Sequence, residues 1–264
     1  MPPQRPAPLA DALRDLPQGP LCVGYSGGLD SSVLLHLLAA TPQVRERGLR
    51  AWHVHHGLHP QADDWAAHCA LICAALSVPL TVSRVQVVLD SGDGPEAAAR
   101  RARHAAFEAG LAADETLALA HHHDDQAETF LLRALRASGP DGLAAMRRWR
   151  DCGHGRLWRP LLDLPRAALE AYAREHALQW IEDPSNADDA YDRNFLRTRV
   201  LPLLRERWPQ ADAALAASAA LNAQAATLLQ QDDALALASV RSADPRALSR
   251  AGLRALAPAR RARV

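Results

Sequence analysis

The chain reads Ser26-Gly27-Gly28-Leu29-Asp30-Ser31-Ser32 directly after a short apolar run, Leu21 to Tyr25, and before apolar residues at helical spacing. This order predicts a strand, a glycine-rich turn and a helix. Glycines let an anion approach the backbone closely, and N–H groups face outward where a helix begins. We therefore expect this loop to bind nucleotide phosphates, with Asp30 placed to hold Mg²⁺. The alternative is an ordinary turn in which Ser31 caps the helix.

Strand and helix patterns alternate over most of the chain. Apolar runs recur at 51–54, 80–83 and 117–120, helical patterns lie between them, and Leu157 to Pro160 reads as a last edge strand. Such alternation predicts an α/β domain, a Rossmann-like parallel five-stranded sheet with helices on both faces, over residues 1–202. Residues 203–264 are rich in alanine, leucine and arginine, so we expect a smaller all-helical domain there. It stops without a capping glycine, and we expect it to continue beyond residue 264.

The composition excludes several kinds of chemistry. Thirty positive side chains balance thirty negative ones, and every positive one is arginine, because the sequence contains no lysine. That rules out the G-x-x-x-x-G-K-[ST] phosphate loop, a pyridoxal Schiff base and a lysine nucleophile. The four cysteines form no C-x-x-C pair, which predicts reduced thiols. No run of about 18 apolar residues occurs, so we expect no membrane span and a cytoplasmic location.

A second polar segment, His121-His122-His123-Asp124-Asp125-Gln126-Ala127-Glu128-Thr129, closes a strand pattern and opens a helical one. Asp125 and Glu128 are three residues apart, so they share a helix face near the carboxyl edge of the sheet. Two carboxylates there can bind a metal, hold an ammonium group or accept a proton. Alternatively, an aspartate caps the helix and the histidines pack. An HD-type metallophosphohydrolase would need further metal ligands and gives residues 26–32 no role.

Arginines recur at spacings that suit anion binding. Arg100 and Arg103 lie one helical turn apart, as do Arg193 and Arg197. Guanidinium groups grip phosphates and carboxylates, although a solvated helix face is the commoner meaning of such runs. Arg147-Arg148-Trp149-Arg150 and seven arginines within 241–264 offer further phosphate contacts, with Trp149 available for stacking, or are simply solvated.

Ser26 to Ser32 resembles the PP-loop of the N-type ATP pyrophosphatases, which cleave ATP to AMP and pyrophosphate. Four further segments look like the tRNA(Ile)-lysidine synthetase family, in the same order: His53–Leu58, Glu96–His104, His121–Thr129 and Arg193–Arg197. Trp180 to Asn186 is similar to a stretch that we expect to shape the same pocket. His104 and His123 depart from the family's usual residues without removing a charged group.

The resemblance implies a ligase that uses ATP and Mg²⁺ to adenylate the C2 oxygen of the wobble cytidine in isoleucine tRNA with a CAU anticodon. Free L-lysine then displaces AMP and forms lysidine. The implied catalytic residues are Asp30, Asp125, Glu128 and Arg193. The implied substrate-binding residues are Arg100, Arg103, His122, Asp125, Glu128, Arg193 and Arg197.

Other functions remain open at this point. A tRNA 2-thiocytidine synthetase-like enzyme would use C-x-x-C cysteines, which this sequence lacks. A non-catalytic nucleotide-binding or RNA-binding module would not need both the loop and the carboxylates. The sequence leaves the oligomeric state open, a homodimer included.

Overall fold

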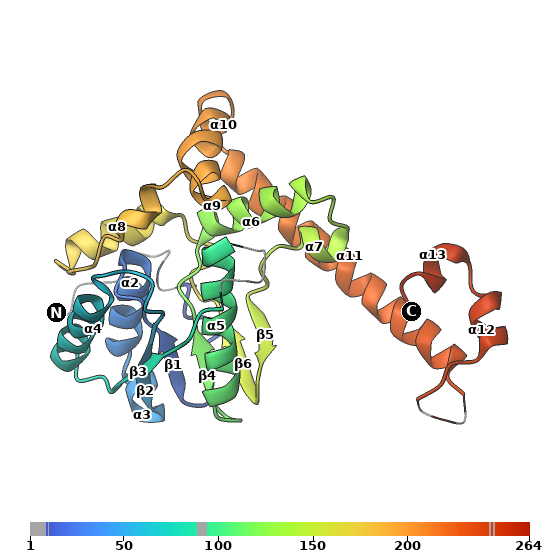
Figure 1. Ribbon diagram of the computed structural model, residues 1–264, viewed down its shortest axis with the longest axis horizontal. Helices are drawn as coiled ribbons and strands as arrows, with labels where there is room; N and C mark the ends of the chain where they lie inside the picture. The colour runs from blue at the N-terminus through green and yellow to red at the C-terminus, as the bar shows by residue number, and fades with distance from the viewer. Residues whose placement is uncertain (1–8, 10, 89–93, 243, 245) are drawn as a thin grey trace.

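The computed structural model describes residues 9, 11–88, 94–242, 244 and 246–264. One sheet of six strands lies at the centre of the body, in the order β3-β2-β1-β4-β6-β5 (Figure 1). All neighbouring strands are parallel except β5 and β6. The strands are β1 (Leu21–Gly24), β2 (Leu49–His55), β3 (Leu80–Arg84), β4 (Thr116–Ala118), β5 (Trp149–Cys152) and β6 (Gly155–Trp158).

Helices cover both faces of this sheet, as the alternating pattern predicts. One core contains side chains of β1 and β2 packed against α2 (Leu29–Ala39), α3 (Pro42–Arg47), α4 (Ala62–Ala75) and α8 (Arg166–Glu175). The other core lies beneath α5 (Gly94–Gly110), where Phe107 and Leu111 meet Trp52, Leu117 and Leu157. Cys69 and Cys73 are buried in the first core, and all four cysteines are free thiols.

The far edge of the sheet differs from the expected five parallel strands. The run beginning at Leu157 is an inner strand, β6, and the edge is β5, an antiparallel strand that Gly153 connects to it through a turn with φ +57°. Arg150 and Asp151 are exposed on β5. Charged side chains are common on edge strands, because they discourage pairing with the strands of other molecules. They also interrupt the alternation of apolar residues by which a strand is recognised in a sequence.

The segment after α8 is mainly helical, apart from an isolated antiparallel bridge between Arg241 and Leu248. It contains α9 (Asp192–Phe195), a π-helical turn (Leu196–Val200), α10 (Leu201–Arg207), α11 (Ala211–Val240), α12 (Arg250–Ala255) and α13 (Pro258–Arg261). The first part of α11 packs on α6 (His123–Leu135) and α7 (Pro140–Leu143), and the rest projects away from the body (Figure 1). The expected boundary at 202 falls inside α10, and a separate domain from 203 onward stays a prediction.

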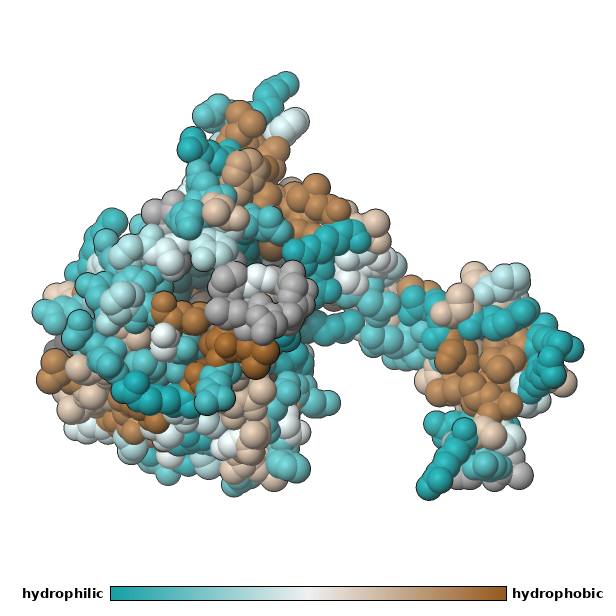
Figure 2. All heavy atoms as spheres, viewed as in Figure 1, coloured by the Kyte–Doolittle hydropathy of each residue, from teal (hydrophilic) through white to brown (hydrophobic). Residues whose placement is uncertain are grey.

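The projecting end forms a second lobe. Figure 2 shows it as a knob joined to the body by a narrow neck. Arg260 pairs with Asp232 on α11, and Arg263 pairs with Asp233 at 2.7 Å. At least these two tail arginines therefore hold the chain end against α11. Among the described helices, none combines the length and apolar character needed to cross a membrane.

The strand order places one polar region at the centre of the sheet. The connections after β1 and β4, which are adjacent strands, run in opposite directions along the sheet. Ligands of doubly wound sheets bind at such a switch point, beyond the carboxyl ends of the strands. Ser26 to Ser32 follows β1 and His121 to Thr129 follows β4, so both predicted segments meet there.

Candidate active site

The loop after β1 begins α2 at Gly28, which is the helix cap, so Ser31 does not cap the helix. The Ser31 hydroxyl donates to the Gly28 carbonyl at 3.0 Å, and the Ser32 hydroxyl to the Gly27 carbonyl at 3.4 Å. Both serines are buried, whereas Ser26 is exposed. In this conformation the two buried hydroxyls shape the loop, and an anion would meet the start of α2.

Gly27 carries the tightest turn of the loop, with φ +85°. Its carbonyl accepts a hydrogen bond from the Ile181 N–H at 2.9 Å. A Cβ on Gly27 would lie 2.6 Å from Ile181 Cδ1 and 3.0 Å from Cys69 Sγ. Ile181 therefore packs against the loop, and the expected role of residues 180–186 in shaping the pocket stays a prediction. The side chain of Asn186 lies outside the described residues.

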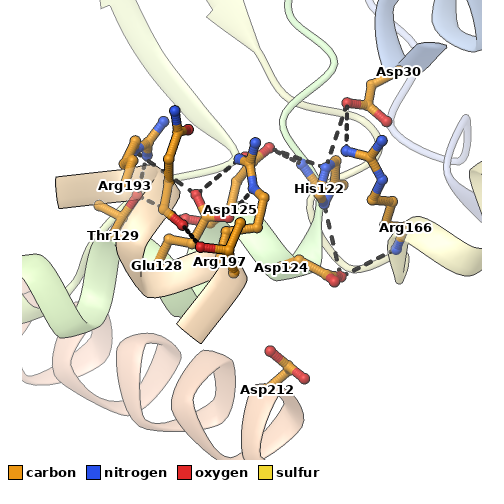
Figure 3. A network of polar contacts seen from close by, with 12 residues as sticks. Asp30, His122, Asp124, Asp125, Glu128, Thr129, Arg166, Arg193, Arg197 and Asp212 are labelled. Atoms are coloured by element: carbon orange, nitrogen blue, oxygen red, sulfur yellow. Dashed lines mark hydrogen bonds and ion pairs between the residues drawn. The ribbon is translucent and has the colours of Figure 1, made fainter. Parts of the chain in front are cut away.

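His122 connects the loop to the second polar segment (Figure 3). Its Nε2 lies 3.5 Å from a carboxylate oxygen of Asp30 and 3.5 Å from one of Asp125. Burial opposes the charge on this ring, but Asp125, Asp30 and Asp124 together raise the pKa of His122 above its usual value. The ring is enclosed, so it holds two carboxylates in place.

Both carboxylates stay charged because of these neighbours. Burial opposes ionisation of Asp30, yet the hydrogen bond and charge of His122 hold its pKa below the usual value, helped by Arg166 and Arg197. Burial likewise opposes ionisation of Asp125, and the charge of His122 leads the causes that lower its pKa. The site thus contains two ionised aspartates on either side of one histidine.

Glu128 lies deeper, with no exposed side-chain surface. Arg197 Nε donates to its Oε1 at 2.7 Å and Arg197 Nη2 to its Oε2 at 3.0 Å, which makes a two-bond pair (Figure 3). Arg193 Nε lies 3.9 Å from Glu128, and its Nη2 donates to the Thr129 hydroxyl at 2.7 Å. Burial raises the pKa of Glu128 above its usual value, against the hydrogen bonds from Arg197.

The two predicted arginine pairs occupy different places. Arg193 and Arg197 join the carboxylates, whereas Arg100 and Arg103 lie near His104, whose pKa falls to about 4 through burial and the charges of both arginines. Burial is the main cause that lowers the pKa of His121. The charges of Arg159, Arg193 and Arg103 lower it further, and Arg103 contributes least of the three. The structure therefore brings His122, Asp30, Asp125, Glu128, Arg193 and Arg197 into one network, and Arg103 lies close enough to His121 to lower its pKa.

The sequence did not reveal every member of the site. Arg166 Nη1 lies 3.9 Å from Asp30, and its backbone N–H donates to Asp124 at 3.1 Å. Arg159 is buried beside His121. Both arginines follow the carboxyl end of β6. Only the order of the strands, which the sequence does not show, places them beside the segments that follow β1 and β4. Trp149 stacks on Trp158 and also contacts the Arg156 guanidinium. Its role in base stacking stays a prediction.

One oxygen of Asp30 fits a cation. Asp30 Oδ1 is buried and has no hydrogen-bond partner among the described residues. A carboxylate oxygen of this kind at a phosphate loop suits Mg²⁺, which takes few protein ligands and shares the rest with phosphates and water. Within the part of the chain that the structure describes, no group of three or more His, Cys, Asp or Glu is arranged to hold a metal ion.

A parallel sheet with a glycine-rich loop at its switch point defines a phosphate-loop protein of the nucleotide-binding α/β class. A family model described as the PP-loop domain matches residues 4–204. The chain therefore belongs to the PP-loop domain family.

Proteins described as tRNA(Ile)-lysidine synthases are similar to nearly the whole chain. The chain is 63% identical to a tRNA(Ile)-lysidine synthase of Xanthomonas axonopodis pv. citri, over 94% of this chain and 56% of the relative. It is 56% identical to the tRNA(Ile)-lysidine synthase of Xylella fastidiosa strain 9a5c, again over 94% of this chain and 56% of the relative. The chain thus spans about half the length of the curated relatives it matches.

A solved structure supports the fold alone. The U34-tRNA thiolase NcsA from Methanococcus maripaludis, with its 4Fe–4S cluster, superposes with a TM-score of 0.65 at 15% identity, over 81% of this chain and 77% of that chain.

Two glycine variants test the loop. Gly27→Ala is expected to lower the free energy of unfolding by about 2 kcal/mol or more, because positive φ and the clash with Ile181 add together. Gly57→Ala is the matched control, since Gly57 also has positive φ (+68°) but nothing within 4 Å of its Cβ. It is expected to cost about 1 kcal/mol. Urea unfolding measures both, and equal losses would contradict the bracing contact.

Proposed function

We propose that the chain carries the ATP-dependent ligase chemistry that forms lysidine on isoleucine tRNA. ATP first adenylates the C2 oxygen of the wobble cytidine and releases pyrophosphate. The amine of free L-lysine then attacks C2, the bond from C2 to the oxygen of AMP breaks, and one amine proton is lost. Such a substrate places the protein in the cytoplasm. Support comes from the similarity to lysidine synthases over 94% of the chain.

The geometry that carries the proposal is the shared histidine. His122 Nε2 lies 3.5 Å from a carboxylate oxygen of Asp30, in the loop after β1, and 3.5 Å from one of Asp125, on α6. Adenylation and amine attack act on the same cytidine carbon and its oxygen, so their binding sites must be adjacent. The buried imidazole of His122, itself part of the second segment, lies 3.5 Å from both carboxylates and fixes that adjacency.

The loop and the arginines divide the anionic groups between them. The start of α2 and Gly27 would receive the triphosphate, with Asp30 Oδ1 holding Mg²⁺, which neutralises phosphate charge when bound. Arg193 and Arg197 would bind the lysine carboxylate or a phosphate, and Arg100 and Arg103 would contact RNA phosphates. Because the chain contains no lysine, no side chain of its own supplies a competing ε-amine.

The two carboxylates of α6 are suited to different tasks. Both oxygens of Glu128 are engaged by Arg197, and the side chain is fully buried. Asp125 is partly exposed. Its carboxylate lies 3.5 Å from His122 Nε2 and 3.5 Å from Arg197 Nη2, so neither contact is as short as those of Glu128 with Arg197. We therefore assign Asp125 to hold and deprotonate the incoming amine, and Glu128 to orient Arg197.

The substrate is tested with labelled lysine, ATP and tRNA transcripts that differ only at the wobble base. The proposal predicts label and AMP in equal amounts with cytidine there and far less of either product with uridine, because cytidine is the intended acceptor. Comparable label in both transcripts, or label in neither, would overturn the proposal.

The role of Asp125 is tested by Asp125→Asn. It is expected to lower kcat/KM for lysine by about 100-fold, because the amide accepts no proton. The variant is expected to stay folded, with some loss of stability from the missing charge, since the amide keeps the shape and an oxygen that accepts from the backbone N–H of His122 at 3.0 Å. Asp163→Asn is the control, because Asp163 pairs with Arg148 on an exposed surface. Equal kinetics in the two variants would show that Asp125 takes no proton.

A further inference from the structure

A buried arginine outside the proposed mechanism lies beyond the carboxyl end of β6. Arg159 is 4% exposed. Its Nη1 donates to the Arg147 carbonyl at 2.6 Å, and its Nε donates to Nδ1 of His121 at 3.1 Å. Both partners are uncharged acceptors. Burial and the charges of Arg150 and Arg100 lower the pKa of Arg159 to about 10, so it remains a cation near neutral pH.

The sheet itself places Arg159 against His121. Strands β4 and β6 are parallel neighbours, with Ala118 opposite Trp158. The ladder continues one bond further, from the Leu119 N–H to the Trp158 carbonyl at 2.9 Å. Arg159 is the next residue on one strand end, and His121 is two residues on along the other. The register of β4 and β6 therefore fixes this contact, which does not depend on a flexible side chain at the surface.

This hydrogen bond decides which nitrogen of His121 carries the proton. A guanidinium group only donates, so Nδ1 must present its lone pair. Burial drives the pKa of His121 well below its usual value despite Asp125 on α6, and Arg159, Arg193 on α9 and Arg103 on α5 act in the same direction. A neutral ring has one proton, and here it must lie on Nε2.

The Nε2–H group is left for a ligand. His121 as a residue is partly exposed, and the described part of the chain offers its Nε2 no hydrogen-bond partner. The ring belongs to the segment that carries Asp125, the carboxylate assigned to the amine. A neutral N–H donor cannot bind an ammonium group, which also only donates, so it suits an acceptor atom of the other substrate.

We propose that Arg159 is a positioning residue that fixes His121 as an Nε2–H donor, and that this donor binds N3 of the target pyrimidine and so selects cytosine over uracil. Cytosine N3 is an acceptor, whereas uracil N3 carries a hydrogen and would face the donor head-on. N3 also gains electron density when the amine adds to C2, so the same bond strengthens during the reaction. The inference rests on the proposed function.

The first test reads the tautomer without any substrate. ¹⁵N NMR of the histidine-labelled full chain, with His121 assigned by a His121→Gln variant, is expected to show proton-free Nδ1 and protonated Nε2. Arg159→Met should convert this signal to a mixture of tautomers. The control Arg148→Met removes a neighbouring arginine that bonds the Pro160 carbonyl and Asp163 instead. A protonated Nδ1 in the parent chain would overturn the inference.

The second test reads selectivity as the ratio of kcat/KM for transcripts with cytidine and uridine at the wobble base. Arg159→Met and His121→Gln are each expected to lower this ratio at least about tenfold, because a freed ring or an amide can turn an acceptor toward uracil. Arg148→Met should leave the ratio unchanged, and KM for lysine should not move in any of the three.

The two failures are distinguishable. A parent chain that labels neither transcript refutes the proposed function. A parent chain that labels cytidine, with a ratio that Arg159→Met does not change, refutes this inference alone. If Arg159→Met does not fold, His121→Gln carries the same comparison.

Discussion

The pair between Glu128 and Arg197 is the interaction on which the rest of the site depends. Glu128 belongs to α6, directly after β4, and Arg197 belongs to the π-helical turn between α9 and α10. Both oxygens of a fully buried carboxylate meet one guanidinium group. A buried carboxylate without a partner is strongly unfavourable, so the helical segment after the sheet must dock where Arg197 can reach.

That docking orders the remaining charges. From the same position Arg197 reaches Asp125 at 3.5 Å, and Arg193, one turn earlier, reaches Thr129. Asp125 meets His122, which meets Asp30 of the phosphate loop. Charges of opposite sign therefore follow one another from α9 to α2, and each lowers the cost of burying the next. The loop after β1 and the carboxylates of α6 thus become parts of one electrostatic unit.

The sequence predicted this site well where local order sufficed. A glycine-rich loop after an apolar run, and carboxylates three residues apart at the start of a helix, need only neighbouring residues to be recognised. The sequence did not predict the edge strand β5, because its charged residues interrupt the apolar alternation, and we expected five strands where the sheet has six. Arg166 and Arg159 were missed as site residues for another reason.

Partners brought together by strand order cannot be read from spacing. Arg166 reaches Asp30, and Arg159 reaches His121, only because β6 inserts between β4 and β5. Likewise, spacing places Arg193 and Arg197 one helical turn apart, but it does not show that Arg197 also pairs with the buried Glu128 carboxylate. Sequence spacing identified the charged groups, and the sheet topology determined which of them neutralise each other.

A double-mutant cycle on unfolding tests this dependence most directly. Glu128→Gln, Arg197→Met and the double variant are compared with the parent chain by urea unfolding. The account predicts that each single change costs about 3 kcal/mol and that the double costs less than their sum by about 2 kcal/mol, because either change alone leaves a buried polar group unpaired. Additive losses would contradict the central role of this pair.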